Sequence, residues 1–322
     1  MNYDIIGDIH GHGDKLDALL GKLGYRHAGG HWAHPNRLAV FVGDFIDRGP
    51  RQLHTVNCVR RMVEAGSALA VMGNHELNAI AWHTPDPGHP GEFLRPHAHP
   101  RWGDKNRQQH RHFLAEVDGS PDLHADVIAW FKSLPLWLDL PEIRVIHACW
   151  HPQCMEFLEP HLGPGRRLPD NLLEAAVVEP PEQGTCSLAN PSVFTAVEAL
   201  TKGIEVSLPA PHTFQDKDGI VRSRVRVRWW DRAAIEYPQA ALLDPERAAA
   251  LPSVPIPVEA RLDLDESKPL FFGHYWMQGV PEPLGPRVAC VDYSAGKGGK
   301  LVAYRFDGED ALRKENFIWV GE

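Results

Sequence analysis

Short apolar runs that stop at a polar residue recur in the first quarter of the chain. Residues 3–8 (YDIIGD) and 38–44 (LAVFVGD) end on glycine and aspartate, and residues 68–74 (ALAVMGN) end on glycine and asparagine. Apolar residues at helical spacing follow the first two runs, namely Leu16, Leu19, Leu20 and Leu23, and then Leu53, Val56, Val59 and Val63. The pattern predicts a repeated unit of strand, polar loop and helix.

Polar side chains gather at the C-terminal ends of these runs. Two later runs, residues 143–147 (IRVIH) and 269–274 (PLFFGH), are typical of buried strands, and both end on histidine. In α/β proteins the carboxyl ends of the strands form the edge where loops converge and ligands bind. We therefore expect one crevice to receive Asp8, His10, Asp44, Asp47, Arg48, Asn74, His75, His147 and His274.

The rest of the chain has weaker patterns. Residues 82–112 are rich in histidine and proline and have no clean period, which predicts a long surface loop in an insertion spanning residues 83–125. A second metal site in this stretch is the alternative. Residues 153–261 are less regular, and we interpret them as a cap or insertion on a core formed by residues 1–152 and 262–322.

Composition narrows the class of protein. The chain has 322 residues and a formal net charge of -9, which disfavours nucleic acid as a partner, although residues 222–228 (RSRVRVR) form a local basic stretch. No apolar run is long enough for a membrane helix and no signal-like segment opens the chain, so we expect a cytoplasmic protein without a membrane partner. Five cysteines without CxxC spacing fit reduced core thiols.

The residue types at the strand ends are those of a metal site. Carboxylate oxygens, an amide oxygen and neutral imidazoles suit borderline divalent ions, with manganese the first candidate and iron, zinc or nickel the alternatives. Asp8 and His10 can share one ion, because alternate residues of an extended strand end project similarly, and Asp44 can bridge two ions. The second ion would be completed by Asn74, His147 and His274. Two cations about 3.5–4 Å apart lower the pKa of a bridging water and clamp the oxygens of a phosphoryl displacement.

Three short motifs, followed by two separated histidines, carry a resemblance. GDIHG at residues 7–11, GDFIDRG at 43–49 and GNHE at 73–76, with VIHA and FFGH after them, resemble the signature of the calcineurin-like metallophosphoesterases. They are most similar to the phosphoprotein phosphatase branch, which includes serine/threonine protein phosphatases and bacterial symmetrical diadenosine tetraphosphate hydrolases. The resemblance covers the N-terminal 150 residues and touches the last 55. It implies a four-layer α/β fold (αββα), in which two mixed sheets pack face to face with helices outside and hold a dinuclear centre.

The resemblance also implies a role for each motif residue. The first ion would be bound by Asp8, His10 and Asp44. The second ion would be bound by Asp44, Asn74, His147 and His274. His75 would be the general acid that protonates the leaving oxygen rather than a ligand, and Asp47 would hold its imidazole protonated. Arg48 would grip the phosphoryl oxygens with its planar guanidinium. Glu76 is interpreted as a structural partner at the start of a helix.

Two departures from the family pattern leave the substrate open. Protein phosphatases of the family usually carry glycines after the third-motif histidine, whereas His147 is followed by Ala-Cys-Trp. The ending DYSAGKGGKLVAYRF resembles that of the bacterial dinucleotide hydrolases, yet those enzymes usually have aspartate where this chain has Glu76. The resemblance therefore does not choose between these two classes.

These observations predict a metal-dependent hydrolase. The main interpretation is hydrolysis of phosphomonoesters or phosphoanhydrides by direct attack of a metal-bound hydroxide, with a phosphorylated small molecule, dinucleotide or phosphoprotein as substrate. Symmetrical bis(5'-nucleosyl)-tetraphosphatase and serine/threonine protein phosphatase are the alternatives within this class. A non-catalytic binding module on the same fold is the alternative from another class, and the presence of every expected site residue disfavours it.

One residue of the cap joins the predicted catalytic set. In related phosphatases an arginine from a comparable loop joins the arginine of the second motif over the metals, and residues 222–230 combine arginines with two tryptophans. Because Arg228 and Trp230 would share one face of a strand, we expect Arg228 to bind the phosphoryl group beside an aromatic wall. Arg226 is expected to contribute less. Core packing of the tryptophans is the alternative.

Overall fold

The computed structural model describes residues 2–180, 187–215 and 219–322 of the chain. The N-terminal part contains β1 (Asn2–Ile6), α1 (Gly13–Leu23), β2 (Arg26–Ala28), β3 (His31–Ala33), β4 (Arg37–Phe41), α2 (Gln52–Glu64), β5 (Ala68–Ala70), α3 (Asn74–His83), α4 (Gly103–Val117), α5 (Pro121–Lys132), β6 (Trp137–Asp139) and β7 (Arg144–Ile146). The middle contains α6 (Pro152–Leu158), α7 (Leu173–Val177), α8 (Val193–Lys202), β8 (Glu205–Ser207), β9 (Phe214–Gln215), β10 (Val221–Arg222), β11 (Arg224–Arg226), α9 (Tyr237–Ala240) and α10 (Pro245–Ala249). The C-terminal part contains β12 (Leu270–Phe272), β13 (Val288–Cys290), β14 (Asp292–Tyr293), β15 (Lys300–Phe306) and β16 (Phe317–Val320).

The largest sheet combines the N-terminal and C-terminal parts of the chain. Its strand order is β14-β15-β1-β4-β5, and β16 also pairs with β15. β1, β4 and β5 run parallel, as the repeated strand, loop and helix pattern predicts, whereas β15 is antiparallel to β1, β14 and β16. The register pairs Ile6 with Phe41 and Phe41 with Ala70. The three parallel strands therefore end side by side at one edge of the sheet.

The second sheet has four strands in the order β13-β12-β7-β6. β7, β12 and β13 are parallel to one another, and β6 is antiparallel to β7. Both large sheets are therefore mixed. β7 and β12 immediately precede two of the predicted site histidines, so this sheet delivers its own strand ends to the crevice.

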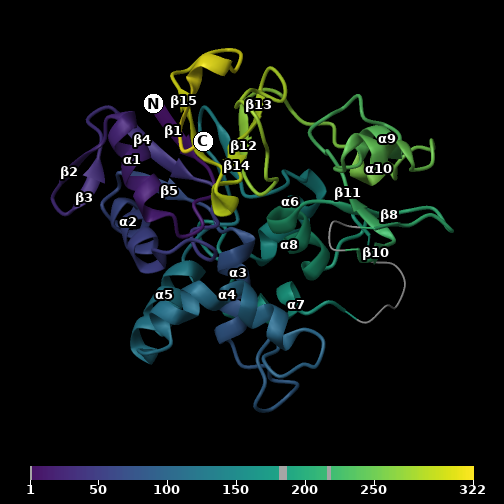
Figure 1. Ribbon diagram of the computed structural model, residues 1–322, viewed down its shortest axis with the longest axis horizontal. Helices are drawn as coiled ribbons and strands as arrows, with labels where there is room; N and C mark the ends of the chain where they lie inside the picture. Colours follow the sequence, from purple (N-terminus) through teal and green to yellow (C-terminus); the bar gives the residue numbers. More distant parts are fainter. Residues whose placement is uncertain (1, 181–186, 216–218) are drawn as a thin grey trace.

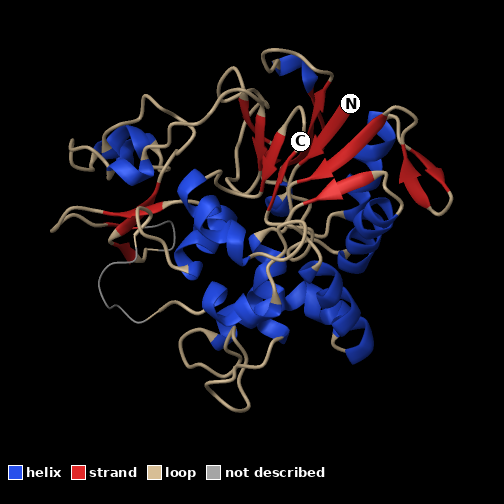
Figure 2. Cartoon of the chain, turned by 180° about the vertical axis from the view of Figure 1, so that it is seen from behind, coloured by secondary structure: helices blue, strands red, loops and turns tan. Residues whose placement is uncertain are grey.

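A shared hydrophobic core joins the two sheets. Alternate strand residues contribute to it, including Tyr3, Ile5, Val40, Val145, Phe271, Val302 and Tyr304. The intervening residues Ile6, Phe41 and Phe272 belong instead to the larger core that includes the helices. α1 contacts β15 and β16, and α2 contacts β5, so these helices cover the outer face of the larger sheet (Figure 1). Seen from behind, the strands fill the upper part of the molecule and helices surround them (Figure 2). The predicted α/β class with two mixed sheets is confirmed.

The prediction of a continuous surface loop over residues 82–112 is wrong at its C-terminal end. α4 begins at Gly103, and α5 begins within the 83–125 insertion. The buried side of α4 is formed by Gly103, Asn106, His110, Phe113, Leu114 and Val117. Polar side chains take core positions at Asn106 and His110, so the apolar spacing that identifies a helix begins only at Phe113.

The middle segment is built from short elements. α8 packs against α6 and α7, while β8 pairs with β11 and β9 with β10 in two small sheets (Figure 1). β11 ends at Arg226, so the strand that was expected to carry Arg228 and Trp230 stops before them.

Two expectations from composition concern thiols and membranes. Free thiols are found at Cys58, Cys149, Cys154 and Cys290, and Cys186 lies outside the described residues. Among the described helices, none has both the length and the apolar character needed to cross a membrane.

Candidate metal centre

The strand ends of both sheets meet at one cluster of buried polar side chains. It contains, in chain order, Asp8, His10, Asp44, Asn74, His147 and His274, which are at most 8% exposed. Three of them adopt the left-handed backbone region, His10 with φ 49°, Asp44 with φ 54° and His274 with φ 73°. Non-glycine residues rarely take this conformation, and strained backbone of this kind concentrates at functional sites.

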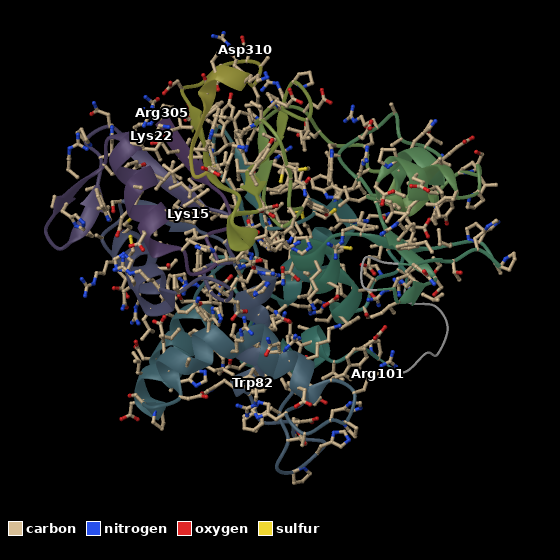
Figure 3. The ribbon with its side chains drawn as sticks, in the orientation of Figure 1. Lys15, Lys22, Trp82, Arg101, Arg305 and Asp310 are labelled. Carbon is tan, nitrogen blue, oxygen red and sulfur yellow. The ribbon has the colours of Figure 1, made fainter. Side chains whose placement is uncertain are left out.

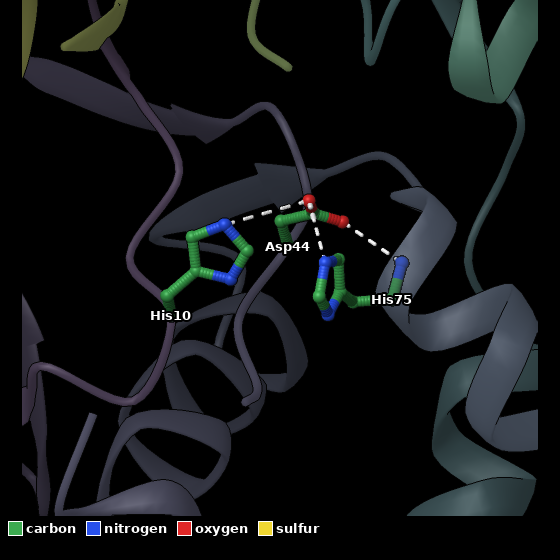
Figure 4. A group of neighbouring side chains, drawn as sticks. All are labelled: His10, Asp44 and His75. Carbon is green, nitrogen blue, oxygen red and sulfur yellow. Dashed lines mark hydrogen bonds and ion pairs between the residues drawn. The ribbon is translucent and has the colours of Figure 1, made fainter. Parts of the chain in front are cut away.

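Asp44 lies in the middle of the cluster. Its Oδ2 atom is 3.7 Å from His10 Nε2 and 3.9 Å from His75 Nε2, and its Oδ1 atom is 3.4 Å from His147 Nε2. Figure 4 shows His10 and His75 directed at the Asp44 carboxylate from separate elements. The ligand atoms of His10, Asp44 and His75 lie within 4.8 Å of one another, and so do those of Asp44, His147 and His274. Two groups that could each hold a cation thus share one carboxylate.

Asn74 and Asp8 complete the cluster. Asn74 Oδ1 is 2.9 Å from His274 Nδ1 and 3.1 Å from His147 Nε2. Asp8 accepts the backbone N–H of His274 with Oδ2 at 3.0 Å. Its other oxygen, Oδ1, faces the Cα of Gly273 so closely that a Cβ added there would lie 2.1 Å away, which explains the glycine before His274.

Several buried nitrogen and oxygen atoms of the cluster could bind a cation. Those without a hydrogen-bond partner in the described ranges include Asp8 Oδ1, His10 Nε2 and His274 Nε2. The His10 ring donates its Nδ1–H to the Ile46 carbonyl at 3.0 Å, which leaves the Nε2 lone pair directed into the cluster. His147 does the same with the Val42 carbonyl at 2.8 Å. Burial lowers the pKa of His10 to about 3, so the ring is a neutral ligand at physiological pH.

The carboxylates leave a buried negative charge that fits divalent cations. Burial raises the pKa of Asp8 well above its usual range, and the charges of Asp292 and Asp44 raise it further. Burial also raises the pKa of Asp292 to about 6. Bound cations would offset this penalty by pairing the buried charges. The donor set of carboxylates, imidazoles and one amide, with no thiolate in either group, suits the ions expected from the sequence.

His75 and Asp47 form a pair beside the cluster. His75 Nδ1 lies 2.5 Å from Asp47 Oδ2, so the opposite ring nitrogen, Nε2, is the one that faces Asp44. Burial opposes protonation of His75, but the carboxylates of Asp44 and Asp47 outweigh it and raise the pKa of the imidazole. A protonated ring with its free N–H directed at the cluster is the arrangement that a general acid requires.

Glu76 is a structural partner, as predicted. Its Oε2 atom accepts the backbone N–H groups of Asp44 at 2.8 Å and Gly73 at 3.0 Å, and its Oε1 atom accepts that of Phe45 at 2.8 Å. The His75 backbone N–H in turn donates to Asp44 Oδ1 at 2.9 Å. The start of α3 and the turn after β4 are therefore locked to each other through one buried carboxylate.

Three side chains beside this interior, Arg48, Trp276 and Lys297, form what we call the rim of the site. Arg48 is exposed, with its guanidinium carbon 4.3 Å from the ring centre of Trp276. The Trp276 ring stacks on His10 at 5.3 Å and 22°, and Lys297 Nζ lies 3.9 Å from the ring centre of Trp276. Sequence reasoning did not assign Trp276 or Lys297 to the site. The nearness of Trp276 to His274 in the chain was a usable signal, whereas a lone lysine among glycines gives none.

The contacts that the structure shows for Arg228 lie within the middle segment. Its backbone N–H donates to the Ala240 carbonyl at 2.7 Å, and its side chain lines a cavity with Trp229 and Arg261. Arg226, two residues earlier, lies with its Nη2 atom 3.5 Å from Glu205 Oε1. Burial lowers the pKa of His274 well below its usual range, and the charge of Arg226 lowers it further.

Comparison with known proteins places the N-terminal part in a family. Residues 1–165, slightly more than half of the chain, match the family model described as calcineurin-like phosphoesterase. The asymmetrical bis(5'-nucleosyl)-tetraphosphatase PrpE of Halalkalibacterium halodurans is 49% identical over 156 residues, which cover 45% of this chain and 55% of that protein. The protein of the same name in Bacillus subtilis is 45% identical over 76 residues, covering 23% of this chain and 31% of that protein. The chain thus spans about half or less of the length of these curated relatives.

Solved structures similar to the chain include two phosphatases. A protein serine/threonine phosphatase from Saccharomyces cerevisiae has a TM-score of 0.46 and 14% identity, covering 99% of this chain and 79% of that one. A cold-active protein-tyrosine phosphatase of a Shewanella species has a TM-score of 0.45 and 14% identity, covering 96% of this chain and 78% of that one.

Proposed function

The chain belongs to the calcineurin-like phosphoesterase family, and from this premise we propose that it is a dinuclear metal-dependent phosphoesterase that hydrolyses dinucleoside tetraphosphates. One observation carries the proposal. Asp44 belongs to both groups of residues that could hold a cation, and buried ligand atoms of Asp8, His10 and His274 have no hydrogen-bond partner among the described residues. Asp8, His10 and Asp44 would hold one cation, and the second would be held by Asp44, Asn74, His147 and His274.

Each remaining residue has a defined task in this proposal. The chemistry that two such cations supply is acidification of a water molecule and neutralisation of charge on the phosphoryl oxygens. His75 donates the proton on Nε2 to the leaving oxygen, and Asp47 fixes the ring through Nδ1. Arg48 binds phosphoryl oxygens with its guanidinium. Glu76 prevents the Asp44 turn from moving during these steps.

The rim supports a nucleotide with several phosphates as the substrate. Arg48 and Lys297 bring two positive charges to the half-buried Trp276 ring, beside the cluster. Two positive charges beside the cluster suit a substrate that carries further phosphates next to the one under attack. The curated relatives bear the name asymmetrical tetraphosphatase, whereas the sequence-based alternative was the symmetrical one. We therefore propose asymmetrical cleavage, in which water splits diadenosine tetraphosphate into AMP and ATP.

A substrate panel at fixed manganese tests this function. Protein stripped with a chelator and then reloaded would be given diadenosine tetraphosphate, para-nitrophenyl phosphate, its bis-ester and a phosphoserine peptide. We expect the highest kcat/KM on the dinucleotide, with AMP and ATP separated by chromatography as the products. Two molecules of ADP would show symmetrical cleavage, and a higher kcat/KM on the peptide would show a protein phosphatase.

A further inference from the structure

Helix α4 contacts the segment between β4 and α2, which carries Asp47 and Arg48. α4 lies beside α3 and α5 at the lower side of the molecule in Figure 1, and its buried face meets residues 47–53. We propose that His110 of α4 is a positioning residue, which holds the Asp47 carboxylate in the orientation that His75 needs. The proposal rests on the proposed function, because it assumes that His75 acts as the general acid.

Asp47 Oδ2 lies between two imidazoles. It is 2.5 Å from His75 Nδ1 and 2.9 Å from His110 Nδ1, and both rings are buried. The ring centroids of His75 and His110 are 6.5 Å apart, and the ring planes are nearly perpendicular, at 83°. One carboxylate oxygen thus lies within 3 Å of the same ring atom from two helices, α3 and α4. The contact with His75 is a hydrogen bond, whereas the contact with His110 is a close polar approach without hydrogen-bond geometry.

Asp47 is held at its backbone and at one carboxylate oxygen. Its backbone N–H is fixed by Gln52 Oε1 at 2.6 Å, but its second carboxylate oxygen, Oδ1, has no hydrogen-bond partner among the described residues. The orientation of the carboxylate therefore depends on the contacts at Oδ2. Without His110, the carboxylate would be held by His75 alone and could turn about that single contact, which would disturb the alignment of the two groups.

Other side chains of α4 hold the loop from the same direction. His112 Nδ1 lies 3.1 Å from the Gly49 carbonyl, and the Glu116 carboxylate accepts the backbone N–H groups of Gln52 at 2.7 Å and Leu53 at 2.8 Å. Glu116 thereby caps α2, whose own N-cap residue makes no side-chain cap hydrogen bond. Of these contacts, the one made by His110 reaches the carboxylate that orients the acid.

A second chain of contacts runs from the insertion to His75. Gln109 Nε2 is 3.5 Å from His75 Nδ1, and Gln109 Oε1 accepts from Arg95 at 2.7 Å. Arg95 also donates to Asn78 on α3 at 3.1 Å. Because His75 Nδ1 carries the proton that faces Asp47, the approach of Gln109 is a packing contact and not a hydrogen bond. The insertion therefore packs against both members of the His75–Asp47 pair, and His110 is its closest contact with that pair.

The alternative is that His110 only fills space in the core. The two roles differ in what its removal changes. A space-filling histidine affects stability and lowers activity equally on all substrates, whereas a positioning residue affects the substrates that need a protonated leaving group. Phosphoserine leaves as a basic alkoxide, and para-nitrophenolate needs little protonation.

The test compares His110→Ala and His110→Asn with wild type on these two leaving groups. We expect His110→Ala to lower kcat on a phosphoserine peptide by about 10- to 100-fold and kcat on para-nitrophenyl phosphate by less than about threefold, with KM unchanged. His110→Asn should recover most of the loss, because its amide nitrogen occupies about the place of Nδ1. In an Asp47→Asn background His110→Ala should have no further effect, since it acts through that carboxylate.

His97→Ala is the matched control. His97 lies in the same insertion, and its ring stacks on that of Trp82 with 3.6 Å between the ring centroids. Trp82 lies at the lower side of the molecule in Figure 3. Among the described residues, no contact joins His97 to Asp47. His97→Ala should lower the melting temperature without changing the ratio of the two kcat values. Equal losses on both substrates in His110→Ala, or the same change of ratio in His97→Ala, would overturn the proposal.

A spectroscopic measurement separates this proposal from the proposed function. The ring proton between His75 Nδ1 and Asp47 should give a strongly downfield imidazole resonance in the wild type, and the signal should vanish in His110→Ala but persist in His97→Ala. If wild-type protein hydrolyses none of the panel while the resonance behaves in this way, the proposed function fails and the positioning role stands. A resonance unchanged in His110→Ala would overturn the positioning role whatever the activity.

Discussion

The interior of the site and its rim are held in place by different means. In the interior, Asp44, His147 and Glu76 each have a backbone partner within 3 Å, and all three side chains are buried. On the rim, Arg48 and Lys297 are exposed, and each lies against the ring of Trp276. The interior is therefore fixed before a substrate arrives, while the rim can adapt to it. We infer that the chemistry depends on the first region and the choice of substrate on the second.

The energetic consequences differ in the same way. A buried donor or acceptor that loses its partner costs about 1–3 kcal/mol, whereas an exposed ion pair contributes about 0–1 kcal/mol. Substitutions in the interior should therefore change metal binding, turnover or stability by large factors. Substitutions on the rim should change KM for particular substrates and leave stability nearly constant.

Asp44→Asn should have the largest effect. The amide keeps the shape of the side chain but removes the charge that both ligand groups share. Wild-type protein should bind about two divalent ions, and the variant should lose at least about 100-fold in metal affinity together with its activity. Metal content by mass spectrometry and reactivation by manganese would measure this. Two ions bound in the variant, with wild-type affinity, would contradict a shared carboxylate.

His75→Asn should remove turnover while keeping the metals. Because the ring nitrogen that faces the cluster supplies the proton, kcat on an alkyl phosphate should fall by about 10²–10⁴-fold, with a smaller loss on para-nitrophenyl phosphate. The metal content should stay at the wild-type value. Equal losses on both substrates would assign His75 to positioning, and loss of an ion would make it a ligand.

Glu76→Gln should act on stability. The neutral amide can accept with its oxygen, but its NH₂ group must then face a backbone N–H, so at least one of the bonds to Asp44, Gly73 and Phe45 is lost. The free energy of unfolding in urea should fall by about 1–3 kcal/mol. Glu92→Gln is the control, because Glu92 accepts a single backbone N–H in a part-buried position and should change stability by less than about 0.5 kcal/mol.

Most residues of the interior could be predicted because they lie at the ends of strands. Asp8, Asp44, Asn74, His147 and His274 were expected together because each follows or ends a recognisable apolar run, and parallel strands end at a common edge. The structure brings them together as expected, and their roles stay predictions. The positive φ values of Asp44 and His274, which aim these side chains, have no signal in a single sequence.

The regions that sequence reasoning missed depend on tertiary contacts. α4 was read as loop because Asn106 and His110 occupy core positions, and the Asp47 carboxylate beside His110 lies far away in the chain. The face of Arg228 was counted along a strand that in fact ends at Arg226. The end of this strand depends on contacts with neighbouring segments, such as the hydrogen bond from Arg228 to Ala240. The alternation of polar and apolar residues in the sequence does not show it.

Arg226 and Arg228 offer a test of that difference in the middle segment. The sequence predicts the larger effect for Arg228→Ala, whereas the charge of Arg226 acts on His274 in the structure. We expect Arg226→Ala to raise KM for diadenosine tetraphosphate or lower kcat by about fivefold, because Arg226 is paired with Glu205 and acts on the cluster only through its charge. Arg228→Ala should remain near wild type. The reverse order of the two variants would favour the original prediction of Arg228 as the phosphoryl ligand.

Lys297→Ala should have the smallest effect. Its Nζ lies over Trp276, whose ring rests on His10, so a substrate phosphate beyond the one under attack would meet this charge, whereas a single phosphate would not. Because Lys297 is exposed, KM for diadenosine tetraphosphate should rise by only about two- to fivefold, with no change on para-nitrophenyl phosphate. Lys300→Ala is the control, since its Nζ donates to the Gly279 carbonyl at 3.0 Å and stands apart from the Trp276 stack. A loss of kcat common to both substrates in Lys297→Ala would move this lysine from the rim to the interior and break the division between the two regions.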